Sequence, residues 1–117
     1  MRVSTLLAAA LLISAPAFAQ QSGDVANGKN HFDNDGCWQC HGYGGQGAAL
    51  TGPRVARTAL TFDQFLNQLR HPANAMPPFE APIVPDATAR DIYAYLESMP
   101  KPPEAKDIPM LYATKGK

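Results

Sequence analysis

Five consecutive residues, Cys37-Trp38-Gln39-Cys40-His41, combine two thiols and an imidazole at a fixed spacing. Side chains three positions apart lie on the same side of a helical turn, so both thiols can reach one partner molecule. C-x-x-C-H is the attachment pattern of c-type haem, in which the thiols form thioether bonds to the two vinyl groups of the porphyrin. The adjacent His41 can then ligate the iron, so five residues supply both the covalent attachment and one axial ligand.

Three other uses of this motif stay open from the residues alone. A thioredoxin-like dithiol needs a βαβ scaffold, and no segment of useful length alternates as a strand does. A zinc centre needs a fourth good ligand, for which His31 and His71 are the remaining histidines. A structural disulfide can form in an oxidising compartment, but it leaves His41 unexplained. We therefore favour covalent haem, because it uses all three reactive side chains.

A haem attached in this way needs a sixth ligand, and the sequence offers several. Met76 is followed by Pro77 and Pro78, which restrict the backbone that carries its thioether. Met99 falls on the apolar face of an expected helix, where core packing explains it, and Met110 lies in a proline-rich tail. His71 is the alternative to Met76 and would give two histidine ligands. We predict Met76 as the ligand.

The elements that must position these residues are expected to be helical. Asp24 can cap a helix over residues 25–34, and Thr61 with Gln64 predicts a capping box for a helix ending near residue 71. Asp86 is expected to cap a third helix over residues 87–99. Residues 42–53 read as a glycine-rich loop, 73–85 as an irregular proline-rich segment, and 101–117 as an extended tail.

The N-terminal segment and the composition limit the class of protein. Arg2, an apolar run and Ala17-Phe18-Ala19 are typical of a signal peptide cleaved after Ala19, although an uncleaved anchor is the alternative. We expect residues 20–100 to form one domain in the periplasm. Ten basic residues balance ten acidic residues, so nothing indicates nucleic-acid binding. A domain this small often needs a cofactor to complete its core.

The chain resembles the class I cytochromes c, which are small monohaem electron-transfer proteins. The resemblance runs from about residue 23 to residue 99 and rests on six pieces in the family's order. They are Gly28 with Phe32, Cys37 to His41, Gly52-Pro53, Arg70-His71-Pro72, Met76-Pro77-Pro78-Phe79, and Ala94-Tyr95-Leu96. The resemblance implies an all-α cytochrome c fold, with three main helices wrapped around one covalently attached haem.

The resemblance also implies roles for residues outside the motif. Gly28 and Phe32 would pack against Tyr95 where the first and last helices cross. The carbonyl of Pro53 would accept a hydrogen bond from the second ring nitrogen of His41, which fixes the tautomer of the ligand. Trp38 and Tyr43 are expected near the haem edge.

The implied function is outer-sphere transfer of single electrons at the haem edge, by a carrier and not by an enzyme. The implied donor is a periplasmic dehydrogenase, with this chain either as a free carrier or as its cytochrome subunit, and the implied acceptor is a membrane oxidase or another cytochrome. The alternative is a haem enzyme or small-ligand sensor in which Met76 dissociates. The residues expected around the haem edge carry no charge, which predicts docking through an apolar surface.

Overall fold

The computed structural model describes residues 22–111, and the predicted signal peptide and the end of the tail lie outside this range. Four α-helices follow one another as α1 (Val25–Asn34), α2 (Trp38–His41), α3 (Phe62–Arg70) and α4 (Asp86–Ser98). Within residues 22–111 the backbone forms no strand, and Ala48 and Gly52 make one isolated bridge. The expected all-α architecture is therefore confirmed. No helix in the described range is long and apolar enough to span a membrane.

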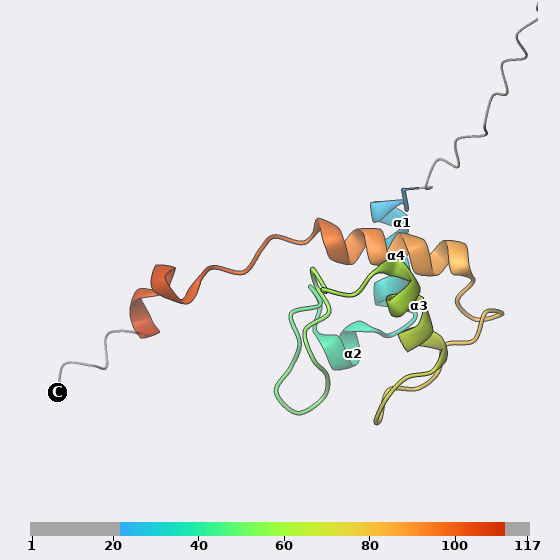
Figure 1. Cartoon of the computed structure of the whole chain (residues 1–117), viewed down its shortest axis with the longest axis horizontal. Coiled ribbons are helices and arrows are strands. Elements are labelled where there is room, and N and C mark those ends of the chain that lie inside the picture. Colours follow the sequence, from blue (N-terminus) through green and yellow to red (C-terminus); the bar gives the residue numbers. More distant parts are fainter. Residues whose placement is uncertain (1–21, 112–117) are drawn as a thin grey trace, which may run out of the picture.

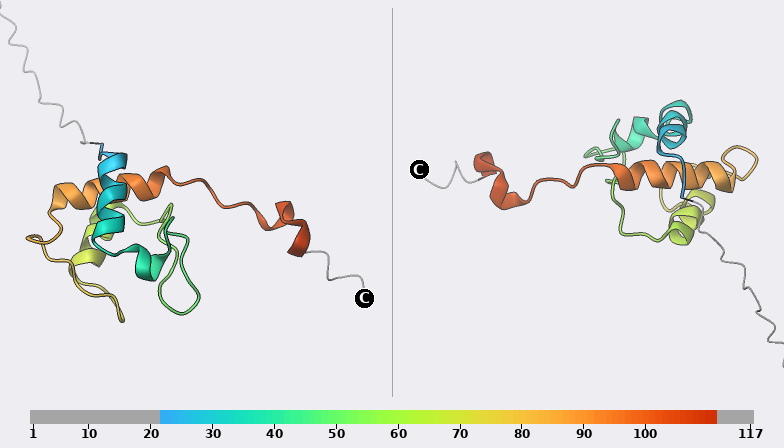
Figure 2. Two further views of the ribbon diagram at one scale, coloured as in Figure 1. Left: turned by 180° about the vertical axis from the view of Figure 1, so that it is seen from behind. Right: turned by 90° about the horizontal axis from the view of Figure 1, so that it is seen from above.

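Helices α1 and α4 cross on one side of the domain (Figures 1 and 2). Asp24 caps α1 as predicted, because its carboxylate accepts from the Ala26 and Asn27 amides at 2.8 and 3.0 Å. The Asp91 carboxylate on α4 accepts hydrogen bonds from the Asp24 backbone amide and from the Asn27 side-chain amide, both at 2.7 Å. These polar contacts fix the start of α1 on α4.

The crossing needs a glycine, although its partner differs from the expected one. A methyl group on Gly28 would overlap the backbone carbonyl of Asp91 on α4. Phe32, one turn further on, contacts Tyr95 with ring centroids 5.5 Å apart. The expectation that both residues face Tyr95 is thus right for Phe32 and wrong for Gly28, because the helices approach most closely one turn before Tyr95.

Helix α3 begins with the predicted capping box, in which Thr61 and Gln64 each bond the other's backbone amide. Its phenylalanines pack on α4, where Tyr93 lies 5.3 Å from Phe65 and 5.7 Å from Phe62 between ring centroids. The Arg90 guanidinium covers the Phe62 ring at 3.8 Å. Phe65 and Leu69 are both buried, so the apolar face of α3 packs toward the core.

Two predictions about the last third of the chain were wrong in detail. Pro85 is the N-cap of α4, and Asp86 is its first helical residue. The Asp86 carboxylate does not cap the helix; it pairs with Arg70 at 2.6 Å. The tail leaves α4 and runs away from the domain (Figure 1), but it contains two short 3₁₀ turns, Ala105–Asp107 and Pro109–Leu111.

Candidate cofactor site

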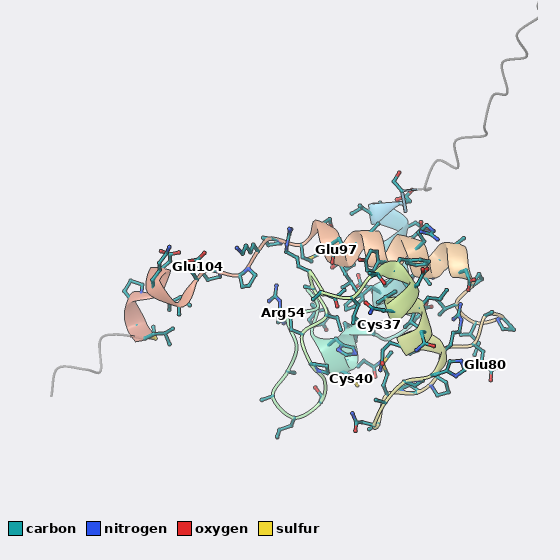
Figure 3. All side chains as sticks on the ribbon, viewed as in Figure 1. Cys37, Cys40, Arg54, Glu80, Glu97 and Glu104 are labelled. Carbon is teal, nitrogen blue, oxygen red and sulfur yellow. The ribbon has the colours of Figure 1, made fainter. Side chains whose placement is uncertain are left out.

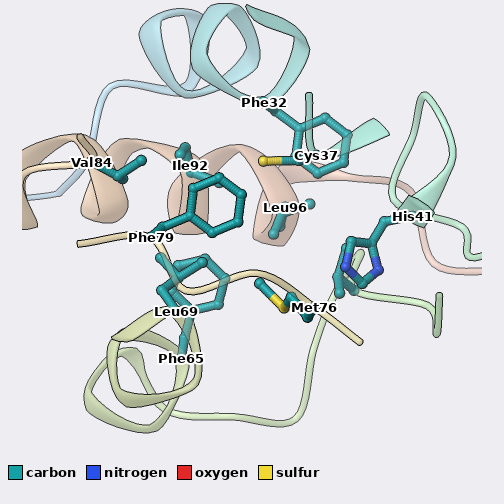
Figure 4. Close-up of a pocket in the computed structure, with 11 residues that line it drawn as sticks. Phe32, Cys37, His41, Phe65, Leu69, Met76, Phe79, Val84, Ile92 and Leu96 are labelled. Carbon is teal, nitrogen blue, oxygen red and sulfur yellow. The ribbon is translucent and has the colours of Figure 1, made fainter. Parts of the chain in front are cut away.

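An apolar cavity, open to solvent on one side, lies between the helices, the loop that joins α2 to α3 and the loop that joins α3 to α4 (Figure 4). The lining comes from α1, α2, both loops, α3 and α4: Phe32, Cys37, His41, Val55, Phe65, Leu69, Met76, Phe79, Val84, Ile92 and Leu96. The His41 imidazole and the Cys37 and Met76 sulfurs are its chemically reactive groups.

Helix α2 is the short turn that carries the C-x-x-C-H motif. Its backbone closes through the His41 amide to the Cys37 carbonyl at 3.1 Å and the Gly42 amide to the Trp38 carbonyl at 2.8 Å. Both cysteines are free thiols; Cys37 lines the cavity, whereas Cys40 is exposed. Figure 3 places Cys40 between the two loops. The turn thus presents the Cys37 thiol to the cavity and leaves the Cys40 thiol accessible from solvent.

The Cys37 thiol is uncharged at neutral pH. Burial, with a smaller contribution from the Asp35 carboxylate, raises the pKa of the Cys37 thiol to about 11. A protonated thiol can remain in an apolar cavity at little electrostatic cost. It is therefore a poor match for a redox dithiol, which needs a depressed thiol pKa.

His41 is oriented by the loop that follows it. Its side chain is 8% exposed, and Nδ1 lies 2.7 Å from the Pro53 carbonyl oxygen. A carbonyl can only accept, so Nδ1 donates and Nε2 keeps its lone pair. The hydrogen bond that the resemblance implied for Pro53 is therefore present. Figure 4 shows the imidazole at the edge of the cavity, where a free nitrogen can ligate a metal.

Gly52 allows the loop to approach this closely. A methyl group on Gly52 would lie 2.8 Å from the Cys40 carbonyl oxygen and 3.1 Å from His41 Nδ1. The loop is also tied to α2 by the Thr51 hydroxyl, which donates to the Cys40 carbonyl at 2.9 Å, and by the Gly47 amide, which donates to the His41 carbonyl at 2.7 Å. The loop and the helical turn therefore form one unit around the imidazole.

Among the candidates for a second iron ligand, Met76 lines the cavity. It lies in the segment between α3 and α4, half-buried against the core cluster (Figure 4). Met99 packs against the core outside the cavity lining, and Met110 is 81% exposed in the tail. His71 is exposed at the C-cap of α3. The arrangement favours Met76 over His71.

The remaining predicted aromatics lie beside the cavity and not in its lining. The Trp38 and Tyr43 rings stack with centroids 4.4 Å apart and an interplanar angle of 10°. The Trp38 indole donates to the Asp33 carbonyl at 3.1 Å, and Tyr43 is 68% exposed. The pair therefore forms part of the surface next to α2.

Sequence reasoning did not identify two lining residues, Val55 and Val84. Both lie in irregular segments with no apolar periodicity, so no pattern separates them from ordinary loop residues. It also gave Arg70 no role beyond a family match, although its guanidinium bonds two carbonyls of the Met76 segment. The available signal in the sequence was an arginine at the end of a predicted helix, two residues before Pro72.

The lining fits a haem better than the alternatives. Within residues 22–111, no three His, Cys, Asp or Glu side chains are grouped to hold a metal ion, so the described part of the chain lacks a zinc ligand set. The motif also lies in an all-helical setting and not on the βαβ unit of a thioredoxin-like site. A flat apolar group with one metal and two vinyl carbons matches an apolar cavity that offers an imidazole nitrogen, a thioether and the Cys37 thiol, with the Cys40 thiol on the same helical turn.

Comparison with known proteins gives two matches. Residues 23–96 match the profile of a family described as "Cytochrome C oxidase, cbb3-type, subunit III". The chain is also 34% identical over 99 residues to cytochrome c-555 of Methylococcus capsulatus, and the match covers 80% of each chain. The family match begins before α1 and ends within α4, so it includes every element that lines the cavity.

Proposed function

Since the chain belongs to the cytochrome c family, in the group described as cbb3-type oxidase subunit III, we propose that one haem is attached to Cys37 and Cys40. We further propose His41 and Met76 as its axial ligands. Membership in this family implies covalent haem, and the chain is a monohaem electron carrier. The observation that supports these ligands is the apolar cavity that His41 and Met76 both line from different segments (Figure 4).

When bound, the haem supplies a one-electron couple between ferric and ferrous iron. The chain provides the surroundings of that couple. Pro53 holds His41 in the tautomer that leaves Nε2 free, and Phe32, Phe65 and Leu96 give the cavity an apolar wall. A methionine ligand opposite histidine raises the reduction potential relative to two histidines.

Two ligands from the chain leave no coordination position for a substrate. This favours electron exchange at the exposed edge over bond-making chemistry at the iron. The second candidate function, a haem enzyme or sensor, requires Met76 to leave. The half-buried packing of Met76 against the core supports the carrier.

The substitution Met76→Ala tests the ligand directly. We expect the oxidised wild-type protein to show a weak far-red absorption band from sulfur-to-iron charge transfer, and the reduced protein to bind no carbon monoxide. Met76→Ala removes the thioether, so the band should disappear and carbon monoxide should bind to the reduced form. Met76→His should keep six ligands but lower the reduction potential.

Met99→Ala is the matched control, because Met99 contacts the same core without lining the cavity. It should retain the far-red band and exclude carbon monoxide. Survival of the band in Met76→Ala would identify another residue as the ligand. Ready binding of carbon monoxide to the wild-type protein would favour the sensor or enzyme.

The redox partners and the periplasmic location are part of this proposal. The leader pattern in residues 1–19 supports export, and the family's description as an oxidase subunit supports an oxidase as acceptor. A periplasmic dehydrogenase is the proposed donor, with this chain as a free carrier or as its cytochrome subunit. N-terminal sequencing of the protein from the periplasmic fraction should begin at Gln20, and a start at Met1 would contradict export by cleavage.

A further inference from the structure

Arg70, the last residue of α3, connects three parts of the domain. Its guanidinium donates from Nη1 to the Phe79 carbonyl and from Nη2 to the Val84 carbonyl, the latter at 2.8 Å. Nη2 also pairs with Asp86 at the start of α4, at 2.6 Å. The Arg70 side chain is 16% exposed, so these bonds form largely out of water.

The two carbonyls belong to the segment that carries Met76. Phe79 and Val84 line the cavity themselves, and the Phe79 amide donates to the Leu69 carbonyl at 2.8 Å. The segment is thus attached to the last turn of α3 on the C-terminal side of Met76. This attachment determines where the segment enters the cavity.

The link between this anchor and the thioether is short and stiff. Pro77 and Pro78 are the two residues between Met76 and Phe79. Each proline ring fixes its own φ angle near −65°, so few backbone rotations separate the Phe79 carbonyl from the Met76 side chain. A shift of Phe79 therefore moves Met76 with it.

The carbonyl bonds are expected to matter more than the ion pair. The Asp86 side chain is 67% exposed, and a solvated partner adds little to an ion pair. The carbonyls of Phe79 and Val84, in contrast, depend on a planar guanidinium that donates in two directions at once. Loss of the guanidinium leaves both carbonyls without this donor.

We propose that Arg70 is a positioning residue that keeps Met76 in place as an iron ligand, by binding the Phe79 and Val84 carbonyls. The inference rests on the proposed role of Met76. It predicts that the strength of the sulfur–iron contact depends on a side chain that does not itself line the cavity. A purely structural role would instead lower the stability of the fold without affecting this contact selectively.

The test compares the haem-containing Arg70→Gln protein with Arg57→Gln. Arg57 also donates to two backbone carbonyls, of Glu97 at 3.2 Å and Met99 at 3.0 Å, but at the end of α4. Both variants lose an arginine that bonds the backbone. The readouts are the far-red band of the oxidised protein, carbon monoxide binding by the reduced protein and the unfolding midpoint.

In Arg70→Gln we expect the fraction of protein that binds carbon monoxide to rise roughly ten- to a hundredfold, with a weaker far-red band. Arg57→Gln should unfold at a lower temperature while binding no more carbon monoxide than the wild type. Asp86→Asn removes the ion pair but keeps the carbonyl bonds, so it should resemble the wild type. Arg70→Lys keeps the charge without the planar donor, and it should fall between the wild type and Arg70→Gln.

The outcomes separate the proposal that Met76 is the iron ligand from the proposal that Arg70 positions it. A wild-type protein without the far-red band, or Met76→Ala with it, contradicts Met76 as the ligand. A band that requires Met76 but is equally strong in Arg70→Gln and Arg57→Gln overturns the role of Arg70 alone. If Arg70→Gln does not fold, Arg70→Lys decides: carbon monoxide binding at the wild-type level overturns the inference.

Discussion

Gly52 controls the surroundings of His41 although it has no side chain. Its Cα lies where any added carbon would press on the Cys40 carbonyl and on His41 Nδ1. The neighbouring Pro53 carbonyl can bond the imidazole only because this space is empty. The orientation of His41, the proposed iron ligand, therefore depends partly on the absence of a methyl group at Gly52, outside the C-x-x-C-H motif.

We predict that Gly52→Ala perturbs His41, the proposed iron ligand. The added methyl group should push Pro53 away from Nδ1 and weaken the hydrogen bond that raises the basicity of the imidazole. The reduction potential should change and the haem should be lost or misligated more readily. Potentiometric titration and the visible spectrum of the purified protein measure these effects.

Gly44→Ala is the control for this substitution. A methyl group on Gly44 would meet Gln46 at 3.4 Å and the Met99 sulfur at 4.0 Å, both ordinary contact distances. Its potential and spectrum should match the wild type. Equal behaviour of the two alanine variants would show that the space at Gly52 has no bearing on His41.

The site residues that sequence reasoning could propose are those marked by a local pattern, and the structure places Cys37, His41 and Met76 among them at the cavity. Cys37, Cys40 and His41 form a contiguous motif, and Met76 is marked by two adjacent prolines. Arg70 acquires its contacts only when the chain after Pro72 folds back over α3. No local pattern encodes that return path, so its acceptors could not be foreseen.

At the scale of elements, helix starts were predictable where a side chain makes the cap. Asp24 and Thr61 both bond the amides expected of them. The prediction that Asp86 caps the last helix was wrong. Pro85 already has the extended backbone of an N-cap, and the Asp86 carboxylate pairs with Arg70 instead. A tertiary ion pair thus overrode a local preference.

The crossing of α1 and α4 predicts an unusual response to Gly28→Ala. In an isolated helix this change would stabilise by about 1 kcal/mol, because glycine is a poor helix former. Here the methyl group would overlap the Asp91 carbonyl, so we expect a loss of roughly 1–3 kcal/mol from overpacking. Denaturant unfolding of the haem-containing protein shows whether the free energy of unfolding falls or rises.

Asn30→Ala provides a reference on the exposed face of α1. It should leave stability unchanged or raise it by a few tenths of a kcal/mol. An increase in stability for Gly28→Ala similar to that for Asn30→Ala would mean that the helices do not meet at Gly28. The packing of α1 on α4 would then need another explanation.

For the whole molecule, the surface that is expected at the haem edge carries no charge. Its exposed members come from α2 and from the tips of both loops: Gln39, Ala48, Ala49, Leu50, Ala73, Asn74, Ala75, Pro77 and Pro78. Leu50 is 98% exposed. Arg54 and Glu80 flank this region on opposite sides of Cys40 (Figure 3). A surface of this kind suits docking by apolar contact.

We therefore predict that electron exchange with the natural donor depends weakly on salt. The rate constant should change less than about threefold between low and physiological ionic strength, because long-range steering needs a charged rim. Stopped-flow reduction at several salt concentrations measures it. A fall of tenfold or more would show that charges elsewhere on the surface steer the encounter.

Two charge variants locate the docking surface. Ala49→Glu places a carboxylate on the uncharged surface expected at the haem edge, and Ala105→Glu places one on the tail. The first should slow the reaction and make it dependent on salt, whereas the second should do neither. The reverse result would assign docking to the tail.

The crossing of the first and last helices also orders events during the biogenesis of the protein. The thiols and imidazole are made early, but Ile92 and Leu96, which complete the cavity wall, are among the last residues of the domain to emerge. Until α4 arrives, α1 has no partner and the motif stays accessible on an unfinished chain. An enzyme that forms the proposed thioether bonds would therefore meet the motif before the fold closes over it.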